Sequence, residues 1–139
     1  MAAFNKFNAF VEDVAEKVHN LGADTLKVML SNVAPVATNA VKADITEIAA
    51  GNGYSAGGNA LTTTSSAQTS GTYKLVLVDS VFTASGGSIA TFRYVVLYNS
   101  TPASGNLIGW YDYGSALTIT TGNSFTVDFD GAAGVLTIA

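Results

Sequence analysis

The sequence contains no cysteine, and only 12% of its residues are charged. The absence of thiols excludes disulfides and thiolate metal sites, so packing and hydrogen bonds have to hold the fold together. Soluble domains typically carry about 25% charged residues. A chain with so few charges covers its surface with Thr, Ser, Asn, Gly and Ala, or buries part of that surface against other subunits.

Basic residues and long apolar runs are also scarce. Six Lys and Arg stand against ten Asp and Glu, for a net charge of -4, whereas nucleic-acid binding needs clustered cations that displace counterions from phosphates. No apolar run approaches the roughly 18 residues that span a bilayer, and the N-terminus MAAFNKFNAFVEDVAEK lacks the continuous apolar stretch of a signal peptide. We therefore expect a protein made in the cytoplasm of the cell that produces it, with no nucleic-acid or membrane partner.

The length of 139 residues is that of a single domain, and its N-terminal part has a pattern of its own. Apolar residues recur there at steps of three and four with charged residues between them, which is typical of an amphipathic helix. These apolar residues are Phe7, Phe10, Val11, Val14, Val18 and Leu21. The spacing predicts a helix near residues 8 to 20, with Asn8 as N-cap and Gly22 as C-terminal stop, in an N-terminal arm of about residues 1–22.

From about residue 23 to residue 139, short apolar runs alternate with turn clusters, which predicts strands. TLKVMLSN (25–32) predicts a strand, and residues 34–59 predict a long connection with one helical turn around 43–48. Long connections in compact domains usually carry contacts or function. The Thr/Ser tract at 62–70 predicts a polar edge strand. We expect a mainly β fold, an antiparallel β-sandwich that is jelly-roll-like and is preceded by one amphipathic α-helix.

The segment GYSAG, Gly53 to Gly57, matches the G-x-S-x-G nucleophile motif of α/β-hydrolases, with Ser55 as the nucleophile. That motif requires a buried strand before it, a helix after it and a histidine later in the chain. Neither flank has the required pattern, and the single histidine, His19, lies upstream. The overlapping G-x-G-x-x-A string GNGYSA fails as a dinucleotide fingerprint for the same reason. We therefore expect no catalytic residue, no cofactor and no enzyme.

Two further motifs have simpler explanations. The segment DFDG resembles the opening of a calcium loop, in which Asp128 and Asp130 would share a strand face. The later ligands of such a loop are missing. A strand end that closes into a turn is the better interpretation. Asn99 opens a formal glycosylation sequon that is more simply a turn before Pro102. His19 has no partner ligand at metal spacing, so we expect a solvent-facing or locally hydrogen-bonded role and no metal.

Residues 89–114, IATFRYVVLYNSTPASGNLIGWYDYG, contain six of the fourteen aromatics (seven Phe, six Tyr and one Trp) and the single Arg. Simple alternation places Phe92, Tyr94, Val96 and Tyr98 on one strand face and Leu107, Gly109, Tyr111 and Tyr113 on one face of the next. Neither strand alternates apolar with polar residues, so both faces are expected to be covered. Arg93 and Asp112 could pair if these strands are neighbours. The rings could form a carbohydrate platform, but core packing and subunit contact are favoured.

The strings FNKFNAFVEDVAEKVHNLGADTLKVMLSNVAPVATNAVKADITEIAAGNGYSAGG, VFTASGGSIATFRYVVLYN and LIGWYDYG cover most of the chain. In them the chain resembles small virion structural proteins of tailed bacteriophages, and most of all the jelly-roll capsid cement, or decoration, proteins, such as that of a short-tailed phage. The resemblance implies a non-enzymatic protein on the outer capsid surface that bridges major capsid subunits. It also implies a homo-oligomer, a dimer or trimer.

For such a protein we expect the interface to use aromatic residues, namely Phe4, Phe7, Phe10, Tyr54, Tyr94, Tyr98, Trp110 and Tyr111. The N-terminal helix and the 34–59 connection are expected to face the capsid, while the aromatic strands serve the core and self-contact. The alternative is a phage tail or fibre component that binds host-surface carbohydrate through an aromatic face.

Overall fold

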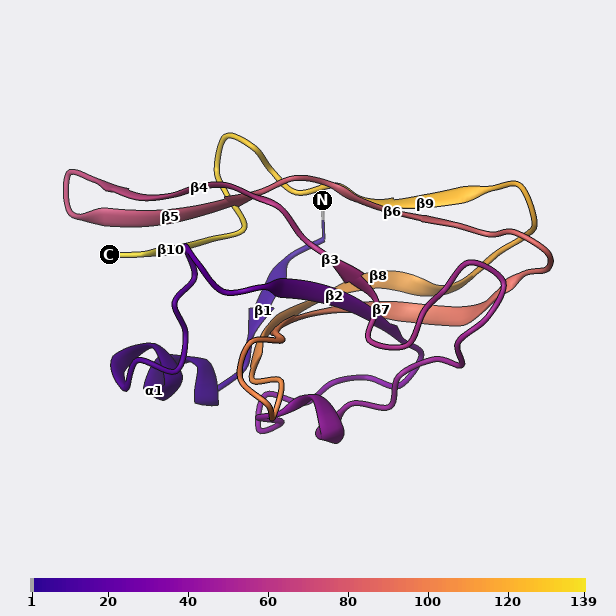
Figure 1. Ribbon diagram of the computed structural model, residues 1–139, viewed down its shortest axis with the longest axis horizontal. Helices are drawn as coiled ribbons and strands as arrows, with labels where there is room; N and C mark the ends of the chain where they lie inside the picture. Colours follow the sequence, from indigo (N-terminus) through magenta and orange to yellow (C-terminus); the bar gives the residue numbers. More distant parts are fainter. Residues whose placement is uncertain (1) are drawn as a thin grey trace.

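The computed structural model describes residues 2–139, which form a mainly β fold with a single α-helix near the N-terminus (Figure 1). The helices are α1 (Ala9–Ala15) and the 3-10 helix η1 (Lys42–Asp44). The first five strands are β1 (Phe4–Lys6), β2 (Leu26–Ser31), β3 (Asn59–Ala60), β4 (Thr63–Thr69) and β5 (Thr72–Leu77). The others are β6 (Ser80–Thr83), β7 (Ile89–Asn99), β8 (Leu107–Ile119), β9 (Ser124–Val127) and β10 (Leu136–Ile138).

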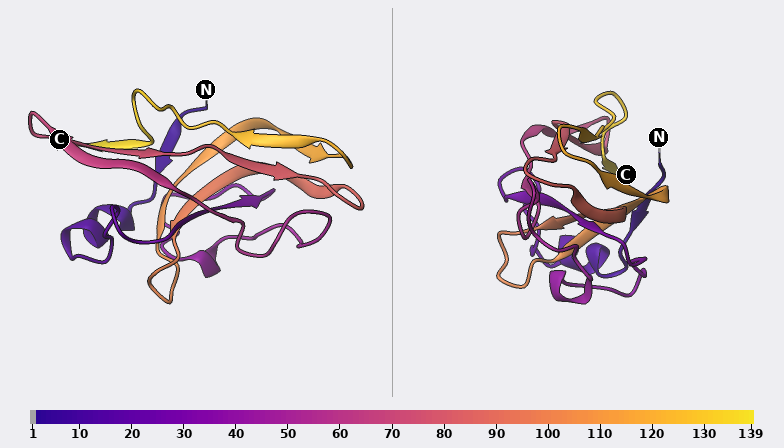
Figure 2. Two further views of the ribbon diagram at one scale, coloured as in Figure 1. Left: turned by 45° about the horizontal axis from the view of Figure 1, so that its top comes forward. Right: turned by 90° about the vertical axis from the view of Figure 1, so that its right-hand side faces the viewer.

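The strands form three antiparallel sheets arranged as two layers (Figure 2). One layer is the five-stranded sheet β1-β8-β7-β2-β3. The other consists of the sheet β10-β5-β4 and, continuing from it, the pair β6-β9. The expected β-sandwich with one N-terminal helix is therefore confirmed, as are the strand at 25–32 and the edge position of the Thr/Ser tract, now β4. The jelly-roll topology stays a prediction.

Both faces of the five-stranded sheet are covered. Val95 and Leu97 of β7 pack into the core between the layers, whereas their neighbours Val96 and Tyr98 belong to a second cluster on the opposite face. Phe7 and Ile45, from the N-terminal segment and the 34–59 connection, complete this second cluster. The cover that the sequence indicated is thus supplied by the chain itself, and no partner is needed to bury this face.

The N-terminal helix is shorter than predicted. It ends at Ala15 because Lys17 takes a left-handed backbone conformation, with φ of 67°. The Val18 N–H then donates to the Asp13 carbonyl over 2.8 Å, and the Lys17 N–H donates to the Val14 carbonyl, a pattern that closes helices. Gly22 is therefore not the stop. Asn8 is not a side-chain cap either, since it makes no capping hydrogen bond.

The predicted strand faces of β7 and β8 are also wrong in part. The pairing of these strands shifts register near Phe92 and again between Leu97 and Tyr98, and such bulges reverse the direction of side chains. Phe92 consequently packs between the layers, not with Tyr98. Leu107 lies in the outer cluster, although Tyr111, four residues later, packs on the core between the layers.

Two smaller expectations fall on the same elements. Arg93 and Asp112 do pair across β7 and β8, with Nε–Oδ1 and Nη2–Oδ2 distances of 2.7 and 2.9 Å. The helical turn in the connection is present as η1, somewhat earlier than predicted. Within residues 2–139, neither helix has the length and apolar character required to cross a membrane.

Candidate functional site

The eight residues expected at an interface divide into two groups. Four have almost no accessible surface: Phe7 (0%), Phe10 (5%), Tyr54 (2%) and Tyr98 (3%). The other four, Phe4, Tyr94, Trp110 and Tyr111, are partly buried. A ring without accessible surface cannot touch a partner, so the assignment of the first four to an interface is corrected: they are core residues. The structure does not bring the eight together into one surface.

Trp110 shows why aromatic density alone was misleading. Its ring centroid lies 4.5 Å from that of Phe7, and it packs against the cluster on the outer face of the five-stranded sheet. Phe4 likewise packs on Tyr111, with centroids 5.5 Å apart. The Arg93 guanidinium carbon lies over the Tyr94 ring, 5.4 Å from the ring centroid. These rings hold the N-terminal segment onto β8 and cover the ion pair.

The GYSAG segment is a loop pinned by tyrosines. The Tyr54 hydroxyl donates to Oε1 of Glu47 over 2.8 Å and accepts the Leu30 N–H over 3.1 Å. Gly57 also donates its N–H to Glu47, and its carbonyl accepts the Tyr98 hydroxyl over 2.8 Å. Burial, more than these hydrogen bonds, raises the pKa of Tyr54 far above its usual value of 10.0. The motif therefore fixes the connection to the sheet.

The surroundings of Ser55 do not match a nucleophile motif. The residues before it form a tight turn closed by a Gly51–Tyr54 bridge, and the strand β3 follows in place of a helix. Ser55 itself is exposed. Gly57 has φ of +86°, and a Cβ there would lie 3.2 Å from the Tyr98 hydroxyl, so this glycine serves the loop. That the chain is not an enzyme stays a prediction.

His19 is buried in a polar cluster that joins the segment after α1 to the β7–β8 loop. Asn99 accepts the Thr101 N–H through Oδ1, so its Nδ2 is the donor toward Nδ1 of His19, 3.1 Å away. The imidazole proton therefore resides on Nε2, which lies 3.7 Å from the Asp13 carboxylate. Burial lowers the pKa of His19, and the charges of Asp13 and Asp24 oppose that shift. The locally hydrogen-bonded role is confirmed.

The remaining motifs are structural as well. Asp130 accepts the N–H groups of Ala132 and Ala133 over 2.8 and 2.7 Å, and these bonds lower its pKa. DFDG is thus a strand end closing into a turn, and residues 2–139 contain no group of three or more acidic or histidine side chains placed to hold a metal ion. Asn99 is fully buried and opens the turn before Pro102, as expected.

Helix α1 and the 34–59 connection, the two segments expected to face the capsid, lie on the same side of the molecule (Figure 1). The Asn8 N–H, at the start of α1, donates to the Ala37 carbonyl over 2.8 Å. Exposed apolar side chains lie on these segments and just before the connection. We call them the outer valines: Val11 (57% exposed), Val33 (54%) and Val36 (54%). Val11 follows the donor of that hydrogen bond by three residues, and Val36 precedes its acceptor by one residue.

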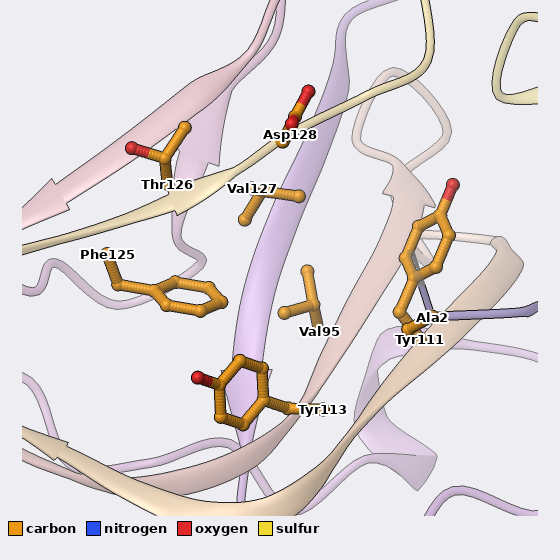
Figure 3. Close-up of a pocket in the computed structure, with 8 residues that line it drawn as sticks. All are labelled: Ala2, Val95, Tyr111, Tyr113, Phe125, Thr126, Val127 and Asp128. Atoms are coloured by element: carbon orange, nitrogen blue, oxygen red, sulfur yellow. The ribbon is translucent and has the colours of Figure 1, made fainter.

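A second surface feature is an apolar cleft of about 380 Å³ between β8 and β9 (Figure 3). It is lined by Ala2, Val95, Tyr111, Tyr113, Phe125, Thr126, Val127 and Asp128. Tyr113, 51% exposed, meets Phe125 edge to face at 5.6 Å, while Tyr111 stands on the opposite side of the two valines. Burial raises the pKa of Tyr111 to about 12, so its hydroxyl stays protonated at neutral pH.

Sequence reasoning found the tyrosines of this cleft and missed Phe125 and the outer valines. The signal for Phe125 was present, because Phe125, Val127 and Phe129 alternate in SFTVDFD and all three pack on the core between the layers. Val11 belongs to the apolar pattern of the predicted helix but is exposed, and nothing in the sequence marked Val33 or Val36, because their exposure depends on how α1 and the connection pack.

Comparisons of the chain with protein-family models, with curated proteins and with solved structures found no match. The outer valines, the aromatic cleft and the resemblance noted in the sequence are therefore the basis for assigning a function.

Proposed function

We propose that the chain is a non-enzymatic virion structural protein that binds the outer surface of a phage capsid and stabilises it by bridging major capsid subunits. The observation that carries this proposal is the joined surface of α1 and the 34–59 connection. It presents Val11 and Val36 in a chain with few charges, and a face that carries exposed apolar side chains is suited to contact with another protein.

The energetics are compatible with such a role. Burying one valine side chain contributes about 1.5 kcal/mol, so three valines provide a few kcal/mol per copy. That is weak for a single contact, but many copies on one shell act together. A ligand that binds the assembled shell and not its separated subunits adds its binding free energy to the stability of the shell.

The test mixes purified protein with expanded, undecorated heads and measures co-sedimentation. Val11→Asp and Val36→Asp place a carboxylate at the proposed contact and are expected to reduce the bound fraction strongly. Val81→Asp is the matched control, because Val81 is 50% exposed on β6 in the opposite layer. Wild-type protein that stays in the supernatant would overturn the proposal, and equal loss for all three variants would overturn the assignment of the face.

The aromatic cleft favours a second candidate, a tail or fibre component that binds host-surface carbohydrate. Its rings offer faces for stacking on sugar carbons, and Thr126 and Asp128 supply polar atoms at its rim. Screening on a glycan array tests this function. Binding that Tyr113→Ala abolishes and Val36→Asp leaves intact would favour it over capsid binding.

A further inference from the structure

Strand β4 (Thr63–Thr69) is an unprotected edge. It is the last strand of the sheet β10-β5-β4, so one side of its backbone has no strand partner among residues 2–139. Its sequence, TTSSAQT, holds no charge and no proline, and most of its residues are exposed. Natural edge strands are usually short, irregular or charged, because an open row of N–H and C=O groups templates pairing with another chain.

The other edges of the described strands have such protection. β3 and β10 are two and three residues long, and β6 and β9 are four each. β1 is three residues long and includes Lys6. The free part of β8 begins after its pairing with β1 and is interrupted by register shifts and by Gly114 at φ of +96°. β4 is seven residues long, with one irregularity at its start.

The charge distribution points to a second copy of the same chain as the occupant. Each copy carries a net charge of -4, which opposes self-association. The strands β3, β4 and β5 together contain one charged residue, Lys74, so the strands at this edge bring no carboxylate of their own to the contact. A two-fold axis places each side chain opposite one of the same strand, and Ser and Thr hydroxyls can both donate and accept, so such a strand complements itself.

We infer that two copies associate by antiparallel pairing of β4 with β4 of the second copy. The inference does not depend on the proposed function, and it specifies the surface for the homo-oligomer that the resemblance implied. Because Ser70 and Gly71 form the two-residue hairpin turn after Thr69, the backbone groups of Ser66 and Gln68 point away from β5. We place the two-fold axis beside Ser66, the central residue of β4, because this register pairs the two strands over their full length and continues the sheet from one copy into the next.

This register makes a specific contact. Ser66 of one chain lies opposite Ser66 of the other. Ser65 of one chain then lies opposite Ala67 of the other, and both residues are exposed. Ser65 and Ala67 pair within the chain with Val76 and Lys74, so their side chains lie on the outer surface of the sheet. Substitutions at these two positions therefore reach the proposed dimer contact without entering the core.

The test measures mass against concentration by sedimentation equilibrium. Wild-type protein is expected to be a dimer that dissociates on dilution. Ser65→Glu/Ala67→Glu places carboxylates opposite one another across the axis and is expected to raise the dissociation constant about tenfold or more. Within the chain, Lys74 faces residue 67, so the new carboxylate there has a neighbouring cation. Ser115→Glu/Thr121→Glu adds the same charge at exposed sites outside β4 and is expected to leave the dimer intact.

Mixing gives the decisive result. Ser65→Lys/Ala67→Lys is expected to be monomeric alone and to form a one-to-one dimer with the Glu variant, because each Lys then faces a Glu. Recovery of the dimer on mixing also shows that both variants are folded. A monomeric wild type, a trimer, or a dimer that neither charge pair weakens would overturn the inference.

Discussion

At the scale of single residues, hydroxyl groups determine how the long connection lies on the sheet. Tyr54 is 2% exposed and satisfies a backbone N–H of β2 as well as Glu47. The sequence contains nothing that distinguishes this tyrosine from a surface aromatic, since the loop around it is rich in glycine. The role of Tyr54 follows only from the structure, in which Glu47 and Leu30 are the hydrogen-bond partners of its hydroxyl.

Tyr54→Phe is expected to lower the free energy of unfolding by about 1–3 kcal/mol, because the buried Leu30 N–H loses its acceptor. Urea denaturation of both proteins measures the difference. Tyr113→Phe is the control, as its ring is 51% exposed and the change is expected to stay within about 0.5 kcal/mol. Equal effects of the two substitutions would show that the Tyr54 hydroxyl does not hold the connection.

His19 gives the fold a pH dependence of definite sign. Its pKa is lowered in the folded state from the ordinary value of 6.5, with burial as the main cause, so the unfolded chain binds more protons below that pH. The free energy of unfolding is therefore expected to fall as pH decreases from 6.5 toward the folded pKa. Asp44, Asp112 and Asp130 have lowered pKa values and lose their contribution only below about 4.

Denaturation curves between about pH 7 and pH 5 separate these groups, because the acids stay ionised in that interval. His19→Gln is expected to flatten the curve there, while the acid-induced loss at lower pH remains. As His19 is the single histidine, no other imidazole contributes. A slope unchanged in the Gln variant would mean that another group titrates with folding.

At the scale of elements, strands were easier to predict than their ends and faces. Residues 25–32 and 62–70 alternate or carry β-branched side chains, and both are strands in the structure. The helix end was mispredicted because Lys17 adopts a conformation that glycine adopts more readily, so Gly22 was the stronger signal. The bulges in β7 and β8 leave no mark in the sequence, because the register depends on the partner strand.

Strand β1 depends on a glycine in its neighbour. A Cβ at Gly109 would overlap the Phe4 ring and lie 2.7 Å from the Asn5 carbonyl oxygen. Gly109→Ala is therefore expected to loosen β1, with faster hydrogen exchange at the amides of residues 4–6 and a loss of about 1–3 kcal/mol of stability. Gly131→Ala, where nothing lies within 4 Å, is the neutral control. Unchanged exchange in Gly109→Ala would show that β1 accommodates the methyl group.

At the scale of the whole molecule, the outer valines and the free edge of β4 lie on different elements of the chain. The outer valines belong to α1 and the segment from residue 33 to residue 36, whereas the edge belongs to β4. The sequence predicted the sandwich and the edge strand, but it could not place the two surfaces on separate parts of the molecule, because that separation depends on how the layers pack. A dimer formed through β4 would leave the outer valines of both copies free to bind the capsid.

This separation predicts that dimerisation strengthens capsid binding by avidity. A dimer presents the outer valines of two copies to the capsid. The Ser65→Glu/Ala67→Glu variant is therefore expected to bind expanded heads about a hundredfold more weakly than wild type, although its own outer valines are intact. Binding isotherms from co-sedimentation measure this loss, with Ser115→Glu/Thr121→Glu as the charge-matched control. Mixing the Glu variant with Ser65→Lys/Ala67→Lys is expected to restore wild-type affinity. A Glu variant that is monomeric and yet binds as tightly as wild type would show that each copy binds the capsid alone.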